Sequence, residues 1–413
     1  MNQLYLFVVL LASITAEKVR YDGYKLYKVH VNSHNGLETL TNMQEDEGYN
    51  FWNLPRMNDS SLLVVPPEKV TEFERLVNKN QMLTMLMMED LQRYIDEENP
   101  KIDRRAVLDW TAYYRLNVIY QWMESLAQEH PKIVTIVNGG VSTLGTPIKG
   151  LKLRFNPNKN TSVFLESGIH AREWISVATT TYIANELIFS EDPAVRSLAE
   201  SYVWYIFPVF NPDGYEYSHT TNRLWRKNLK RYTFGCKGVD LNRNWESHWA
   251  EIGTSSNPCA ETFPGSKPFS EIETKSMSTF IKNIPEKLAA YIAFHSYSQL
   301  LLIPFGHSNA KIDNYDDLME IGKFSAKALA KRYGTDYTVG NIVDVIYAAS
   351  GGSMDWVRAT VGPRISYTYE LRDKGRYGFI LPASEIIPTG EETMDSLLAM
   401  FQKAEDLGYG SRQ

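Results

Sequence analysis

The stretch that decides the fold is Ser162-Val-Phe-Leu-Glu-Ser-Gly-Ile-His-Ala-Arg-Glu-Trp174. It begins with an apolar run typical of a buried strand, a glycine follows, and residues 174 to about 188 have the pattern of a helix. This order places His170 and Glu173 at the carboxyl edge of a strand, which is where open α/β sheets hold their ligands. We therefore expect an α/β sheet with a functional site at that edge.

The chain contains residues that could hold a catalytic metal ion. His170 and Glu173 share one turn, and His295 in Ala293-Phe-His-Ser-Tyr297 supplies a distant third ligand. Two imidazoles and one carboxylate hold a catalytic zinc ion and leave its fourth position open. Glu370, in Tyr367-Thr-Tyr-Glu-Leu371, offers a second carboxylate as a base for a water molecule. These residues indicate a zinc hydrolase with one Zn²⁺.

A second His-x-x-Glu occurs at His248-Trp-Ala-Glu251, in a polar loop that follows no strand. We interpret this copy as coincidental. The chain has 8 histidines, and those outside the predicted ligand set are expected to be ordinary surface or core residues. These are His30, His34, His130, His219, His248 and His307.

The composition is that of a folded, mildly acidic protein. Its 413 residues exceed what one domain usually needs, so we expect two units. A hydrophobic fraction of 43% is ample for a packed core. The net charge of −6 and the lack of a basic stripe argue against nucleic-acid binding.

The N-terminus has the features of a secretory signal. Leu4-Tyr-Leu-Phe-Val-Val-Leu-Leu11 is too short to span a bilayer, and small residues follow it up to about Ala16. We therefore predict a signal peptide over residues 1–16 and secretion without a membrane anchor. Asn58-Asp-Ser60 and Asn160-Thr-Ser162 are glycosylation sequons whose use the sequence leaves open.

Cys236 and Cys259 are the only two cysteines. An oxidising compartment favours their pairing, and closing a loop of that length would contribute on the order of 3.5 kcal/mol in the chain-entropy model. The alternative is two free, buried thiols.

Residues 17 to about 100 are expected to form a small α+β unit. The alternating segment 24–31 predicts a strand, the segment 68–77 after two prolines predicts a helix, and strand and helix follow over 82–88 and 91–98. A polar stretch from Asn99 then ends in the basic pair Arg104 and Arg105. It is either a site for a trypsin-like protease in a zymogen or a solvated interdomain linker.

Strands and helices alternate from about residue 106 to the end, which predicts a mostly parallel or mixed sheet covered on both faces. The predicted helices cover residues 117–130, 174–188, 270–283, 316–333 and 393–407. The predicted strands cover residues 149–155, 202–207, 289–294, 300–304 and 364–370.

Several motifs together make the chain resemble a known family, and they are distributed through the second unit in a fixed order. They are Gly168-Ile-His-Ala-Arg-Glu-Trp174, Asn222-Arg-Leu-Trp-Arg-Lys227, Gly238-Val-Asp-Leu-Asn-Arg-Asn-Trp245, His295-Ser-Tyr297, Tyr347-Ala-Ala-Ser-Gly-Gly352 and Glu370-Leu-Arg-Asp-Lys-Gly-Arg-Tyr-Gly378. With them the chain resembles the secreted zinc metallocarboxypeptidases of the digestive procarboxypeptidase A/B type. The resemblance covers essentially the whole chain.

The resemblance implies a fold and a domain plan. The fold would be a mixed, mainly parallel eight-stranded sheet flanked by helices, preceded by an antiparallel α+β prosegment that shields the active-site cleft. Residues 1–16 would be the signal peptide, 17–105 the activation prosegment and 106–413 the catalytic domain. Activation would follow cleavage after Arg105, after Arg104 or at another basic residue nearby.

The resemblance also implies residue roles. His170, Glu173 and His295 would be the zinc ligands, Glu370 the general base, and Arg226 the stabiliser of the oxyanion, a role typically worth ~3 kcal/mol. Asp240 would orient the first histidine ligand from outside the metal's own shell. Taken singly, Arg223 or Arg226 could instead be a surface salt-bridge partner, and Tyr347 could be packing. The residues implied to bind substrate are Asn242 and Arg243 for the terminal carboxylate, Tyr347 for closure, and Arg172, Ser296 and Tyr297 for further subsites.

The specificity pocket would have Met354 at its floor, where an aspartate would imply preference for C-terminal Lys or Arg. With Ile342, Ile346, Ala349 and Thr368 it would form an uncharged pocket, which implies A-type specificity for apolar or aromatic residues. Methionine replaces the smaller branched residue common in A-type members, so the balance between aromatic and aliphatic residues stays open. Leu241 replaces a proline often found before the Asn-Arg pair, which would loosen the carboxylate-binding loop slightly.

Two rival functions remain to be weighed. One is a secreted binding protein with a degenerate site, against which stand the complete ligand set, the base and the oxyanion arginine. The other is an intracellular zinc hydrolase acting on polyglutamate tails, which would want a basic pocket floor. The expected partners are peptides with a free C-terminus, an activating trypsin-like protease and proteinaceous carboxypeptidase inhibitors, with a monomer as the family default. A broad neutral pocket on a zymogen suits digestion in a gut lumen.

Overall fold

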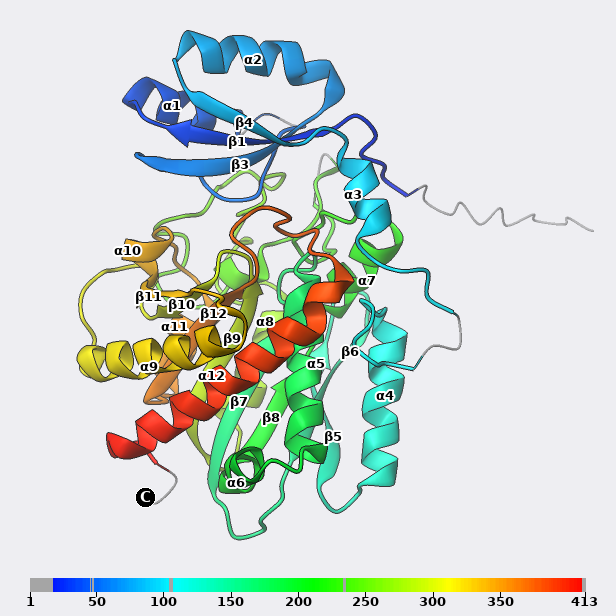
Figure 1. The fold of residues 1–413 in the computed structure, drawn as a ribbon, viewed down its shortest axis with the longest axis vertical. Coiled ribbons are helices and arrows are strands. Elements are labelled where there is room, and N and C mark those ends of the chain that lie inside the picture. Colours follow the sequence, from blue (N-terminus) through cyan, green and yellow to red (C-terminus); the bar gives the residue numbers. More distant parts are fainter. Residues whose placement is uncertain (1–17, 45, 47, 104–106, 233–234, 411–413) are drawn as a thin grey trace, which may run out of the picture.

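The computed structural model describes residues 18–410 except 45, 47, 104–106 and 233–234. It contains two β-sheets, and the smaller one lies over one end of the larger α/β body (Figure 1). The predicted signal peptide over residues 1–16, both arginines of the basic pair, and the boundary after Arg105 lie outside the described residues. No helix in the described part of the chain is long and apolar enough to cross a membrane.

The larger sheet has eight strands in the order β11-β10-β12-β9-β7-β8-β6-β5. Strands β12, β9, β7 and β8 pair in parallel, β11 is parallel to β10, and the pairs β10–β12, β6–β8 and β5–β6 are antiparallel. The expected mixed, mainly parallel sheet is therefore confirmed. Its strands are β5 (Val134–Val141), β6 (Pro147–Leu153), β7 (Thr161–Ser167), β8 (Val203–Phe207), β9 (Lys287–Ser296), β10 (Leu300–Ile303), β11 (Thr338–Asn341) and β12 (Ile365–Leu371).

Helices cover both faces of this sheet, and the alternation of side chains along the strands assigns each residue to a face. On β7, Val163 and Leu165 join the core beneath α5 and α12, whereas Phe164 joins the opposite core beneath α8 and α11. All residues of β7 and β8 are buried, which explains their continuous apolar sequence. The helices of this body are α4 (Leu116–Glu129), α5 (Trp174–Phe189), α6 (Pro193–Ser201), α7 (Pro212–Thr220), α8 (Ile272–Lys282), α9 (Tyr315–Tyr333), α10 (Ile342–Val345), α11 (Ser353–Thr360) and α12 (Ile386–Asp406), with short 3-10 turns η3 (Leu241–Arg243) and η4 (Ala383–Glu385).

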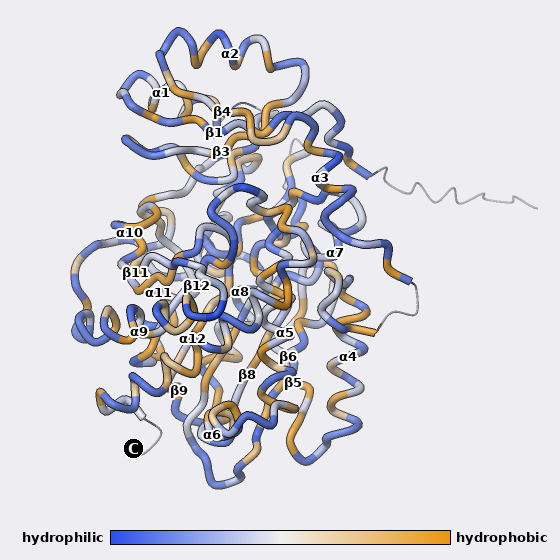
Figure 2. The backbone as a smooth tube through the Cα atoms, viewed as in Figure 1, coloured by the Kyte–Doolittle hydropathy of each residue, from blue (hydrophilic) through white to orange (hydrophobic). Residues whose placement is uncertain are grey.

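The N-terminal unit is a four-stranded antiparallel sheet in the order β2-β3-β1-β4. Helices α1 and α2 cover its outer face, and in Figure 2 the colour of α2 alternates between hydrophilic and hydrophobic, as expected for a helix with one buried side. Its inner face packs on the α/β body, where Trp52 and Leu62 share a hydrophobic cluster with Tyr297 and Phe379. The elements are β1 (Lys25–Val31), α1 (His34–Met43), β2 (Asn50–Phe51), β3 (Asp59–Val65), η1 (Pro67–Lys69), α2 (Val70–Lys79), β4 (Leu83–Met88) and α3 (Leu91–Glu97).

The structure contains several elements that the sequence-based prediction does not include, and α12 and β5 show why. Helix α12 begins at Ile386 rather than Thr393. Pro388 lies in its first turn, where backbone N–H groups have no partner within the helix, so a proline is tolerated there. The sequence-based prediction contains no strand over β5. Two glycines, Gly139 and Gly140, weaken the strand pattern, and the register of β5 shifts between Asn138 and Val141.

The disulfide between Cys236 and Cys259 is confirmed, with Cα atoms 4.9 Å apart. It closes a loop on the surface of the α/β body next to Lys227. The buried ammonium group of Lys227 donates to the carbonyl oxygens of Pro258 (3.0 Å) and Ala260 (2.8 Å). The loop is thus held both covalently and by a cation on its carbonyl groups.

Candidate functional site

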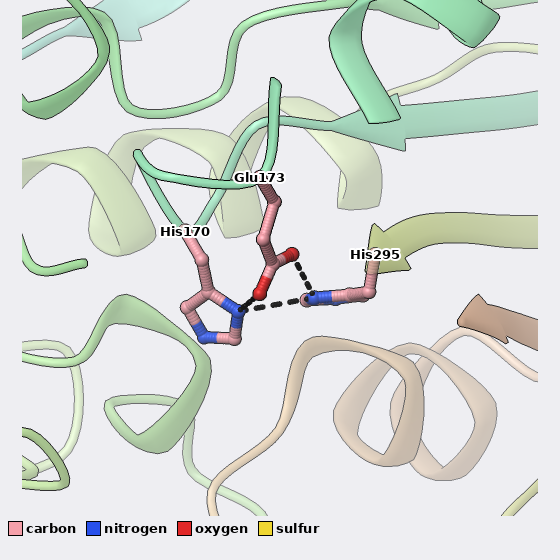
Figure 3. A group of neighbouring side chains, drawn as sticks. All are labelled: His170, Glu173 and His295. Carbon is pink, nitrogen blue, oxygen red and sulfur yellow. Dashed lines mark hydrogen bonds and ion pairs between the residues drawn. The ribbon is translucent and has the colours of Figure 1, made fainter. Parts of the chain in front are cut away.

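The predicted metal ligands meet at the carboxyl edge of the large sheet. His170 lies in the turn after β7, Glu173 at the start of α5, and His295 near the end of β9, which is the parallel neighbour of β7. Their side chains point toward one another (Figure 3). His170 Nδ1 lies 2.9 Å from Glu173 Oε1, and His295 Nδ1 lies 3.0 Å from Glu173 Oε2. Among the residues that the structure describes, this is the only such cluster of three or more potential metal ligands.

The spacing of these atoms fits a zinc ion. The two Nδ1 atoms are 3.1 Å apart, and ligands about 2.0–2.1 Å from a tetrahedral zinc lie roughly 3.3 Å from one another. Two imidazole lone pairs repel at this distance unless a cation or a proton lies between them. His170 Nε2 donates to Asp240 Oδ1 at 3.1 Å, which keeps the lone pair of His170 on Nδ1. The residues present can therefore hold Zn²⁺ with one position open.

The electrostatics of the three predicted ligands also favour a bound cation. Burial pushes the pKa of Glu173 upward, but the adjacent His170 and His295 outweigh burial and hold that pKa well below its ordinary value. Burial lowers the pKa of His295, yet the contact with Glu173 raises it above its ordinary value. The carboxylate thus favours a positive charge at this point, which a bound cation supplies in place of a proton.

Asp240 connects the predicted metal ligands to a cation. Its Oδ1 atom accepts from His170, and its Oδ2 atom accepts from Arg226 Nε (3.1 Å) and Nη2 (2.8 Å). Arg226 Nη1 also lies 3.9 Å from Glu173 Oε1. Arg226 is therefore a buried cation beside the metal ligands, not a surface salt-bridge partner.

Glu370 lies on β12 directly opposite His295 on β9, so the parallel pairing of these strands brings it to the ligands. It is partly buried. Burial raises the pKa of Glu370 above its ordinary value, and Glu173 adds to the rise while His295 opposes it. A carboxylate in this setting takes up a proton more readily than an exposed one.

Three of the predicted substrate-binding residues lie together. Arg243 Nη2 lies 3.5 Å from the hydroxyl of Tyr347, and its other nitrogens donate to backbone carbonyl groups. Asn242 Oδ1 accepts from the backbone N–H of Ser353 at 2.9 Å, which fixes the orientation of the Asn242 amide group. An arginine fork beside an amide donor is suited to a carboxylate.

The other predicted substrate-binding residues contact the ligands or the N-terminal unit. The Ser296 N–H donates to Glu173 Oε2 at 3.3 Å. Arg172, which is 2% exposed, lies 3.4 Å from Asn50 Oδ1 of β2, and the Tyr297 ring packs on Trp52. A cavity of about 320 Å³ separates the N-terminal unit from the site and has Arg172, Arg226 and Tyr347 in its wall.

The predicted pocket residues fall into two groups. Met354 is buried at the start of α11, where its sulfur lies 3.4 Å from Thr368 Oγ1, and Ile342 packs against the same hydrophobic cluster. Ile346 and Ala349 lie in the segment that carries Tyr347. Ala349 N–H donates to Gly306 O at 2.8 Å, so this segment is tied to the loop after β10.

The N-terminal unit was expected to shield the site, but sequence reasoning did not identify the residues that make the contacts. Arg56 donates to the carbonyl oxygens of Val345 and Ile346, immediately before Tyr347. Glu98 pairs with Arg223, and both are buried, so Arg223 is not a surface residue. No local signal marks these partners, because each pair is separated by more than a hundred residues.

The chain is similar to known proteins. A family model described as zinc carboxypeptidase matches residues 119–396, and one described as carboxypeptidase activation peptide matches residues 27–98. The chain is 46% identical to zinc carboxypeptidase A 1 of Anopheles gambiae, over 97% of this chain and 94% of that protein.

Two solved structures are also similar. Carboxypeptidase A from Helicoverpa armigera aligns with a TM-score of 0.85 at 29% identity, covering 94% of this chain and 99% of that one. Bovine thrombin-activatable fibrinolysis inhibitor, solved in complex with tick carboxypeptidase inhibitor, aligns with a TM-score of 0.67 at 35% identity, covering 72% of this chain and 99% of that one.

Proposed function

Because the chain belongs to the zinc carboxypeptidase family and carries a carboxypeptidase activation peptide, we propose that it is secreted as a zymogen. Its activated form removes apolar or aromatic residues from the C-termini of peptides, an activity suited to digestion in a gut lumen. The observation that carries this proposal is the meeting of His170, Glu173 and His295 within about 3 Å of one another, with Glu370 beside them.

The reaction is hydrolysis of the last peptide bond. His170, Glu173 and His295 would hold Zn²⁺, which would supply a Lewis acid for the scissile carbonyl group and for the attacking water molecule. Glu370 takes a proton from the attacking water on its carboxylate and passes it to the nitrogen of the leaving residue. Arg226 presents a fixed positive charge to the oxygen that becomes negative, which stabilises the transition state more than the ground state.

Recognition of the free C-terminus is the task of a second group of residues. Asn242 and Arg243 bind the terminal carboxylate, and Tyr347 closes over the substrate next to them. Met354, Ile342, Ile346, Ala349 and Thr368 line an uncharged specificity pocket. Two observations support the A-type preference. The residue at the pocket floor, Met354, is uncharged, and similar proteins are named carboxypeptidase A. Arg172, Ser296 and Tyr297 bind the residues before the scissile bond.

The N-terminal unit, residues 17–105, keeps the zymogen inactive, and a trypsin-like protease releases it by cleaving after Arg105. The contacts of Asn50, Trp52 and Arg56 with the site support this role, because they occupy or hold residues needed for substrate binding. Proteinaceous inhibitors are further partners, since bovine thrombin-activatable fibrinolysis inhibitor binds the tick carboxypeptidase inhibitor. The activated protein is a monomer.

The test is release of C-terminal residues from matched peptides ending in Phe, Leu, Lys or Glu, before and after trypsin treatment. A Phe peptide with an amidated C-terminus is the control, because an exopeptidase of this kind needs a free carboxylate. We expect trypsin-dependent release of Phe and Leu that a zinc chelator abolishes. Preferred release of Lys or Glu would refute the pocket assignment. No release from any peptide, with zinc supplied and the N-terminal unit removed, would refute the enzymatic function.

A further inference from the structure

Two histidines with no part in the proposed reaction lie ring against ring on the surface near the site. The rings of His248 and His307 have centroids 3.6 Å apart and are inclined by 18°. His248 Nδ1 lies 2.9 Å from Glu251 Oε2, and His307 Nδ1 lies 3.4 Å from the buried carboxylate of Asp355. The His-x-x-Glu at residues 248–251 therefore holds its own imidazole in place, and that imidazole lies flat on a second one.

The stacked pair joins two loops that enclose a third. We call residues 346–352, which carry Tyr347, the pocket loop. On one side lies the flanking loop 245–253, on the other the flanking loop 304–308. The pocket loop exchanges backbone hydrogen bonds with the first through Trp245 N–H to Gly351 O (3.0 Å) and Gly351 N–H to Ser247 O (2.7 Å). It bonds to the second through Ala349 N–H to Gly306 O (2.8 Å).

Glycines allow these loops to approach so closely. A Cβ atom on Gly351 would lie 2.2 Å from Arg243 O, one on Gly253 would lie 2.4 Å from Ala348 O, and one on Gly306 would lie 2.6 Å from Ala349 O. No side chain fits at these three positions, so the loops meet there backbone to backbone. The Ser350 hydroxyl adds hydrogen bonds to the backbone of Glu251 and Ile252 in the first flanking loop. The stacked rings of His248 and His307 provide a side-chain contact that joins the two flanking loops directly.

We propose that His248 and His307 form a clasp across the two flanking loops and so position the groups that recognise the C-terminal residue of the substrate. The inference rests on the proposed function, in which Arg243 and Tyr347 bind the substrate. Arg243 Nε donates to Gly253 O in one flanking loop at 3.1 Å, and Tyr347 belongs to the pocket loop. Opening the clasp lets all three loops move, which lowers the fraction of enzyme ready to bind.

The clasp acts on binding and not on the bond-breaking step. The metal ligands and Glu370 lie on or beside β7, β9 and β12, and none of them belongs to the three loops. Loss of the stacking contact therefore raises KM while leaving kcat nearly unchanged. An aromatic pair of this kind gives an effect of about two- to tenfold.

The experiment uses the full-length chain, loaded with zinc and activated by trypsin. The variants are His248→Ala, His307→Ala, the double variant, and His248→Phe, which keeps a flat ring but cannot bond to Glu251. The matched control is His130→Ala, which removes a surface His–Phe ring contact with Phe189 far from the site. Each is assayed with a peptide ending in Phe, and hydrogen exchange of residues 346–352 is followed in the same proteins.

We expect His248→Ala and His307→Ala each to raise KM by about two- to tenfold. The double variant should have a KM no higher than that of the more impaired single variant, because both substitutions remove the same contact. His248→Phe and His130→Ala should have the KM of the protein without substitutions. The pocket loop should exchange faster in the alanine variants only. An unchanged KM in His248→Ala, or a His248→Phe variant as impaired as His248→Ala, overturns the clasp. If the protein without substitutions releases no residue, the proposed function fails. Hydrogen exchange of residues 346–352 then tests the clasp by itself. Faster exchange in His248→Ala supports the clasp, and equal exchange overturns it.

Discussion

Replacing Asp240 with asparagine perturbs the site at the point where one carboxylate serves two partners. In the structure Oδ1 accepts from His170 Nε2 (3.1 Å) and from the backbone N–H of Asn242 (2.9 Å), while Oδ2 accepts both hydrogen bonds from Arg226. Asparagine has one oxygen and one NH₂ group. Whichever way it turns, the NH₂ group faces donors: His170 and the Asn242 backbone in one orientation, Arg226 in the other.

The size of the effect follows from these contacts. Loss of the partner that orients a ligating histidine typically weakens metal binding by about 10- to 100-fold. Arg226 is buried and loses its counter-charge, which costs the folded state roughly 3–5 kcal/mol. A displaced Arg226 also fails to stabilise the oxyanion, which lowers kcat by about 10²–10³-fold even when zinc is saturating.

The assay has three readouts and a matched control. Zinc affinity is measured by competition with a chelating dye, kcat/KM at saturating zinc, and stability by urea unfolding of the metal-free protein. The control is Asp213→Asn, a buried aspartate that accepts from Ser142, Leu144 and Thr146 away from the site. We expect the control to lose stability but to keep its zinc affinity and its activity at saturating zinc.

Two results would refute this reasoning. If Asp240→Asn binds zinc within about threefold of the unchanged protein, then Asp240 does not orient His170. If excess zinc restores full activity, then Asp240 does not position Arg226. A loss of zinc affinity that Asp213→Asn reproduces would mean that the effect comes from general destabilisation.

Three further predictions concern the pocket, the pH dependence of stability and the zymogen. Met354→Asp should lower kcat/KM for peptides ending in Phe by about tenfold or more and raise kcat/KM for peptides ending in Lys. The reason is that the new buried carboxylate pairs with the ammonium group of the C-terminal Lys. Unchanged selectivity would contradict the pocket assignment. Burial, reinforced by Arg223, holds the pKa of His219 well below its ordinary value. The unfolded chain therefore takes up a proton below about pH 6.5 that the folded chain refuses, and stability falls by up to about 1.4 kcal/mol per pH unit on acidification. His219→Phe, which keeps the stack on Trp174, should lose less stability than the unchanged protein between pH 7.5 and 5.5 in urea unfolding, and equal losses would count against this account. Arg56→Ala should raise the activity of the uncleaved chain by about three- to tenfold, since the bonds of Arg56 to the carbonyl oxygens of Val345 and Ile346 help to hold the N-terminal unit over the site. The trypsin-activated enzyme should be unaffected, and an effect that persists after activation would place Arg56 outside the prosegment's role.

Local sequence was sufficient to propose the metal ligands and to predict the elements that carry them. His170 and Glu173 are identified by the strand before them and the helix after them, and that helix begins at Trp174 as predicted. The pairing of Cys236 with Cys259 needed only their number and an oxidising compartment. These features are readable because residue type, hydrophobic period and short spacing act within a few turns of chain.

Only the tertiary structure decided which distant residues meet. The adjacency of β7, β9 and β12 brings His170, His295 and Glu370 together, and strand order depends on the packing of the whole sheet rather than on any one segment. The same holds for Arg56 against Val345 and for Glu98 against Arg223, whose burial the sequence could not show. A window of sequence carries local preference, but the free energy that chooses long-range partners is a sum over the entire core, so these contacts appear only when the fold is known.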